Sequence, residues 1–167
     1  MFGLLKATCP VEPAIRDWLD TEWAGLKRDL ALDLSSRPVL EPSDEFFPDP
    51  WRRDPASAQA MLARLCGYMG VDASTVELAF YQTDPATEAP PMLARQGERF
   101  LLPFDVTELG SPAASAAVLA RKLALLRLVL AGVDQSREDL PLLGDLATVA
   151  LGAGVIAANA AVPELPR

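Results

Sequence analysis

The absence of histidine restricts the chemistry open to this 167-residue chain. Histidine is the usual general base near neutral pH and the commonest metal ligand. A chain without it cannot use Ser-His-Asp or Cys-His catalysis, and it cannot form a zinc site with imidazole ligands. Paired carboxylates, a reactive cysteine, and an oxygen-ligand site for calcium or magnesium remain open.

Two cysteines, Cys9 and Cys66, could act as nucleophiles or form a disulfide. Neither lies in a CxxC pair, and no histidine is present to activate a thiol. We therefore expect reduced structural thiols, and the sequence leaves open whether the two are close in space. Asp44, Glu45 and Asp49 suggest calcium, but their spacing does not match an EF-hand, so we interpret them as part of a surface loop.

The spacing of apolar residues predicts the elements that position these groups. Periods of three and four residues predict helices over residues 12–34, 56–69, 111–131 and 142–161. Alternating patterns predict a strand over 76–81, a hairpin of 92–95 with 99–104, and a short edge strand at 39–40. This order is typical of an α+β fold in which helices pack on a small mixed or antiparallel sheet. We expect a two-helix C-terminal hairpin and one domain spanning 1–167, because no linker divides the chain.

Residues 41–55 form a proline-rich segment that cannot adopt regular structure. We expect Phe46, Phe47 and Trp51 to hold this loop against the core. Asp54 should cap the following helix, with Pro55 in its first turn.

The last predicted helix is apolar over about twenty residues, which is the length of a membrane span. Asp145, Thr148 and Asn159 interrupt it, and alanine and glycine are commoner in it than leucine and isoleucine. Aromatic anchors at its ends are also missing. We interpret it as a buried core helix.

Several motifs are similar to those of a known family. They are Cys-Pro-Val at 9–11, Phe-Phe-Pro-Asp-Pro at 46–50, Cys-Gly-Tyr-Met-Gly-Val at 66–71, and Gly-Asp-Leu at 144–146 leading to Ala-Asn-Ala at 158–160. In these motifs and in its element order the chain resembles an uncharacterised bacterial family with a zincin-like, HExxH-bearing metallopeptidase core. The resemblance covers most of the chain. It implies a small sheet leading into a helix that would carry the zinc ligands.

The chain departs from that family at the metal site. The resemblance places the first histidine at Arg121, the general-base glutamate at Lys122 and the second histidine at Leu125, with Asp145 as the one surviving acidic position. HExxH works because residues four apart share a helix face, so two imidazoles bind one zinc ion. Arginine and leucine cannot replace them, and one carboxylate cannot hold zinc alone. We expect four degenerate metal-site positions, no zinc and no peptidase activity; whether Arg121 pairs with Asp145 stays open.

The net charge of −8 also restricts the partners of the chain. Nucleic acids and anionic membranes would repel it, whereas a protein partner fits. With the resemblance, this favours a catalytically inactive metallopeptidase-like domain that binds or regulates another protein and has no cofactor. Two alternatives are a hydrolase that holds a divalent ion with Asp145 and Glu138, and a small-ligand domain that uses the vacated metal cavity. The N-terminal residues lack signal-peptide features, so we expect a cytoplasmic protein.

Overall fold

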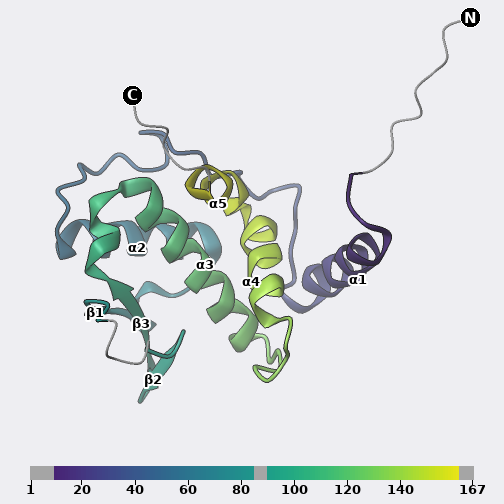
Figure 1. The fold of residues 1–167 in the computed structure, drawn as a ribbon. Helices are drawn as coiled ribbons and strands as arrows, with labels where there is room; N and C mark the ends of the chain where they lie inside the picture. The colour runs from purple at the N-terminus through teal and green to yellow at the C-terminus, as the bar shows by residue number, and fades with distance from the viewer. Residues whose placement is uncertain (1–9, 85–89, 162–167) are drawn as a thin grey trace, which may run out of the picture.

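The computed structural model describes residues 10–84 and 90–161, which form an α+β fold (Figure 1). The helices are α1 (Pro13–Asp29), α2 (Pro55–Met69), α3 (Pro112–Leu130), α4 (Leu140–Thr148) and α5 (Gly154–Ala161), and the strands are β1 (Val76–Tyr81), β2 (Ala94–Gln96) and β3 (Arg99–Asp105). Short helical segments η1 (Ala73–Thr75), η2 (Val106–Gly110) and η3 (Val149–Ala153) join them. The α+β class predicted from the element order is confirmed.

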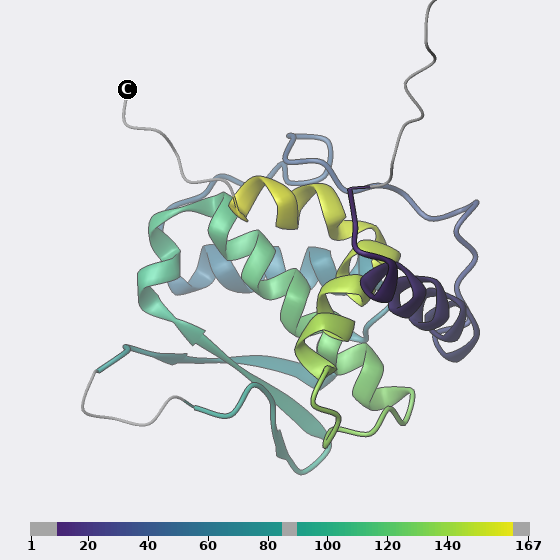
Figure 2. The same cartoon turned by 45° about the vertical axis from the view of Figure 1, so that its right-hand side comes forward.

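The sheet is mixed and has the order β1-β3-β2. β2 and β3 form the predicted hairpin, with Gly97 at a φ of +62° in the turn. β1 pairs with β3 in parallel, so that Val76 lies opposite Phe100. Figure 2 shows the helices on one side of this sheet. The buried side chains of Leu78, Leu102 and Phe104 join the sheet to the helical core.

Helix α3 is the centre of the helical layer. Ser111 caps it by accepting a hydrogen bond from the Ala114 N–H, and Pro112 occupies its first turn, as helix N-termini favour. α2, α4 and α5 all pack against it. α3 and the α4–α5 segment together make the predicted C-terminal helical hairpin.

The second arm of that hairpin is broken at Gly152, so the prediction of one uninterrupted last helix is wrong. Gly152 has a φ of +92°, and a Cβ atom there would lie 2.3 Å from the Pro38 carbonyl oxygen. The Gly152 carbonyl accepts a hydrogen bond from the Leu40 N–H at 2.8 Å. Leu40 is therefore buried beside the break. The predicted edge strand at 39–40 is also wrong, because this segment pairs with the helix break and not with the sheet.

The run Leu140–Ala161 is, by length and composition alone, apolar enough to cross a membrane. In the structure, 44% of its most apolar stretch is buried within the protein. The interpretation as a buried core helix therefore holds for one face of this run, because Leu142 and Val149 remain exposed on the other.

The proline-rich loop is held as predicted. The Trp51 indole donates to the Leu109 carbonyl at 3.1 Å, and the Tyr68 hydroxyl donates to the Phe46 carbonyl at 3.0 Å. Phe47 packs against the core. Asp54 accepts a 2.7 Å hydrogen bond from the Ser57 N–H and so caps α2.

Helix α1 is shorter than the predicted 12–34 and lies at the side of the molecule, next to α4 (Figures 1 and 2). Its C-terminal end is anchored, because Leu26 and Leu30 are buried. Arg127 of α3 donates to the Leu30 carbonyl at 3.3 Å and to the Gly70 carbonyl at 2.8 Å, joining the ends of α1 and α2. The N-terminal half of α1 is much less covered, and Ile15 is 51% exposed.

Candidate interaction site

The Arg121–Asp145 pair, which the sequence left open, is present. The Arg121 Nε lies 2.8 Å from Asp145 Oδ1, and its Nη2 donates to Oδ2 at 2.9 Å. The two side chains are 49% and 51% exposed. This fork geometry suits a guanidinium and a carboxylate, and it links the middle of α3 to α4 on the protein surface.

Leu125 lies one turn further along α3 and closes the space between the two helices. It is buried, and a Cβ atom on Gly144 would lie only 2.7 Å from its Cδ2 atom. The absence of a side chain at Gly144 is what lets Leu125 pack so closely against α4. The cavity expected at the vacated metal position is therefore filled by protein.

Lys122 is half-buried and belongs to a different environment. Burial lowers the pKa of its amine, while the charge of Glu108 in η2 acts in the opposite direction. Three of the four predicted positions, Arg121, Leu125 and Asp145, therefore share the α3–α4 interface. Lys122 instead interacts electrostatically with Glu108 of η2.

The acidic pocket required by the hydrolase alternative is not formed at the closed α3–α4 contact. Asp145 is occupied by Arg121, and Leu125 fills the neighbouring space. Across residues 10–84 and 90–161, no three Cys, Asp or Glu side chains are grouped so that they could hold a metal ion.

Cys66 is a buried free thiol. Burial, reinforced by the charge of Asp72, raises its pKa to about 11, so the reactive thiolate is scarce at neutral pH. This agrees with the expected structural role. Cys9 lies outside the described residues, so the question of whether it is close to Cys66 lies outside them too.

An apolar groove lies between α1 and α4, on the opposite side of α4 from its buried contacts with α3. Its volume is about 660 Å³. The residues that line it are Ala14, Ile15, Trp18, Leu19, Asp139, Leu142, Asp145, Leu146 and Val149. Leu142 and Val149 in this lining are 60% and 52% exposed. Large aliphatic side chains that are exposed next to one another on a protein surface often mark an interaction site.

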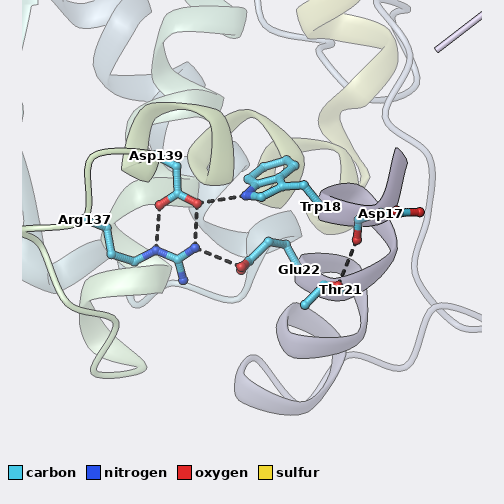
Figure 3. Close-up of polar contacts among 6 residues, drawn as sticks. All are labelled: Asp17, Trp18, Thr21, Glu22, Arg137 and Asp139. Carbon is cyan, nitrogen blue, oxygen red and sulfur yellow. Dashed lines mark hydrogen bonds and ion pairs between the residues drawn. The ribbon is translucent and has the colours of Figure 1, made fainter. Parts of the chain in front are cut away.

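Figure 3 shows a cluster of polar contacts that joins α1 to Arg137 and Asp139, just before α4. The Arg137 guanidinium makes two hydrogen bonds to Asp139, at 2.8 and 2.7 Å, and an ion pair with Glu22 at 2.9 Å. The Trp18 indole donates to Asp139 at 2.9 Å. We call Trp18, Glu22, Arg137 and Asp139 the α1 clamp.

The α1 clamp shifts the ionisation of its members. The Arg137 guanidinium, followed by the Trp18 indole, holds the pKa of Asp139 well below its usual range. Asp139 and Glu22 raise the pKa of Arg137. Both groups are therefore charged near neutral pH, and the clamp fixes the position of the Trp18 ring in the groove wall.

A smaller cavity, of about 190 Å³, lies at the N-terminal end of α3. Its lining includes the apolar residues Phe47, Met61 and Ile156 and the polar residues Ser43, Asp44 and Asn159. This cavity is distinct from the predicted metal position, because none of the four degenerate positions lines it.

Sequence reasoning missed the groove, although part of its signal was visible. Ile15 and Leu19 belong to the apolar spacing that predicts the first helix, and Leu142, Leu146 and Val149 follow helical spacing in the last. Periodicity identifies an apolar helix face without showing whether another element covers it.

Comparison with family profiles, curated proteins and solved structures gave no match to the chain. The zincin-like resemblance therefore stays a prediction based on sequence motifs. The α+β arrangement and the α1–α4 groove are described from the structure itself.

Proposed function

We propose that this protein is a catalytically inactive, zincin-like domain that acts as a protein-binding or regulatory module through the α1–α4 groove. The observation that carries the proposal is the exposure of Ile15, Leu142 and Val149 around one apolar depression. Exposed apolar surface bordered by polar groups is typical of sites where proteins bind.

The chemistry at the degenerate positions supports the non-catalytic part of the proposal. The guanidinium of Arg121 is permanently charged and cannot ligate a cation, and Leu125 has no lone pair to offer. Asp145 is engaged by Arg121 at 2.8 Å. We also propose a cytoplasmic location without a cofactor, in keeping with the free thiol of Cys66.

The test compares two variants in which glutamine replaces an exposed apolar side chain, one inside the groove and one outside it. Leu142→Gln removes an exposed apolar side chain from the groove, and Val39→Gln does the same outside it, where Val39 is 58% exposed. Partners recovered by cross-linking should be retained by wild type and Val39→Gln and lost from Leu142→Gln. Equal recovery by all three would overturn the groove assignment. One tightly bound zinc ion per purified chain would overturn the claim of an inactive domain.

A second candidate function, small-ligand binding, is favoured by the cavity at the α3 N-terminus. A mainly apolar lining with a few polar groups is typical of such sites. A thermal-shift screen with small molecules should identify compounds that stabilise wild type but not Ala113→Leu, whose larger side chain narrows the cavity. Equal stabilisation of both proteins would reject this second function.

A further inference from the structure

The two chain segments that form the sides of the groove carry much of the protein's net negative charge. Residues 12–22 and 137–149 together contain seven acidic and two basic side chains, which accounts for five of the eight net negative charges in the chain. Both charged residues that line the groove are carboxylates, Asp139 and Asp145. The surface around the groove should therefore attract cations over a distance comparable to the screening length.

The carboxylates within the groove retain some capacity to accept hydrogen bonds. Asp145 accepts from Arg121 through both oxygens but is 51% exposed, and an ionised carboxylate has about four acceptor positions. Asp139 has fewer acceptor positions left, because it already accepts hydrogen bonds from both Arg137 and Trp18. Asp145 therefore keeps an exposed edge beside its ion pair with Arg121, whereas the other acids act through their field.

The shape of the groove matches a short helix. Asp139, Leu142, Leu146 and Val149 follow one face of α4, and this ten-residue rise corresponds to about 15 Å, or three helical turns. Ile15 and Leu19, four residues apart, provide the opposite wall on α1. A groove between two helices is suited to an amphipathic helix whose apolar residues recur at three- and four-residue spacing.

A second copy of this chain suits the groove poorly. Bringing two such surfaces together would place like-charged walls against each other, which is unfavourable. A stable dimer also needs about 800 Å² buried on each partner, whereas only a few large apolar side chains are exposed here.

We propose that the α1–α4 groove binds a short amphipathic helix of a partner protein whose polar edges carry lysine or arginine. This inference rests on the proposed protein-binding function and specifies the partner for that site. The apolar face of the helix covers Ile15, Leu142 and Val149. A basic residue at its edge pairs with the exposed side of Asp145.

The experiment uses two designed peptides of about 18 residues, enough for a stable helix with leucine along one face. One carries lysine at the polar positions and the other carries glutamate. Binding to the full chain is measured by calorimetry and by tryptophan fluorescence, since Trp18 lines the groove. We expect the lysine peptide to bind at least about tenfold more tightly, with an affinity that falls as salt rises from about 50 to about 500 mM.

Variants separate the apolar and electrostatic contributions. Leu142→Gln should weaken the lysine peptide about tenfold, and Val39→Gln should leave it unchanged. Asp17→Asn with Asp20→Asn removes two exposed charges on α1, and it should reduce the preference for lysine severalfold without affecting the apolar contact.

The possible failures are distinguishable. Equal binding of the two peptides, with Leu142→Gln weakening both, would overturn the cationic partner and leave the groove as a docking site. A lysine peptide that binds Leu142→Gln as well as wild type would overturn the groove as its location. If neither peptide binds while Leu142→Gln still loses cross-linked partners, the helix inference fails and the proposed function stands.

Discussion

The two sides of α4 differ in how completely other parts of the protein cover them. Toward α3, Leu143 and Ala147 are buried and Gly144 receives Leu125, so that the interface is closed. Toward α1, Leu142 and Val149 are left exposed around the groove. The positions that the resemblance singles out contribute packing and an ion pair, whereas the exposed apolar surface lies on the other side of the helix.

The largest loss of stability should come from disturbing the α3–α4 contact between Leu125 and Gly144. Leu125→Ala should lower the free energy of unfolding by about 3 kcal/mol, because it removes a buried side chain and leaves a cavity. Gly144→Leu should also destabilise by overpacking. Denaturant unfolding of both single variants and of the double variant tests the contact, since the combined loss should be smaller than the two losses added together. Strict additivity would contradict it. Gly25→Ala is the control, with no atom near its new Cβ.

The next largest loss of stability should come from removing the hydrogen bonds of Arg127 at the C-terminal end of α1. Arg127→Met removes the donors that reach the Leu30 and Gly70 carbonyls, at the ends of α1 and α2. Charged hydrogen bonds to helix C-termini predict a loss of about 2 kcal/mol. Thermal unfolding measures it, with Arg52→Met as an exposed control. Equal midpoints for the two variants would show that Arg127 does not join the helices.

The α1 clamp should make the groove side sensitive to acid. The pKa of Asp139 is depressed in the folded protein, so its stabilising contribution is complete above the unfolded-state pKa near 4 and is lost as pH falls toward the folded-state pKa. Wild type should therefore lose more stability than Asp139→Asn on acidification from about pH 5 to pH 2. Hydrogen exchange should show α1 amides opening first in wild type at low pH. Parallel pH curves for the two proteins would argue against the clamp.

The smallest loss of stability should come from breaking the Arg121–Asp145 ion pair on the surface. Arg121→Ala breaks a half-exposed ion pair, which should cost only about 0.5 kcal/mol. Chemical denaturation in low and high salt should show that even this loss is screened. A loss comparable to that of Leu125→Ala would mean that Arg121 has a structural role beyond the ion pair.

The sequence predicted those parts of the fold that depend on local pattern. Periodicity identified the helices and the β2–β3 hairpin, and the cap at Asp54 was recognisable from its neighbouring Pro55. The break at Gly152 was not predicted, because the apolar pattern continues through it and the segment that packs against it, at Pro38 and Leu40, is distant in the sequence.

The candidate site was predictable only on its closed side. The resemblance directed attention to Arg121 and Asp145, which do pair. The groove depends on how α1 lies against α4, and that placement involves Trp18 and Asp139, which are 121 residues apart. Asp139 occupies a polar turn that local sequence alone does not distinguish from a solvated loop.

We propose that binding occurs on the α1 side of α4 and not at the buried α3–α4 contact around Leu125. Titration of isotopically labelled protein with the lysine peptide, followed by amide NMR, tests it most directly. We expect chemical-shift changes concentrated in residues 14–19 and 139–149, with little change in the buried turn of α3 around Leu125. Changes centred on the cavity that contains Met61 and Ile156, or an absence of changes along α1, would contradict it.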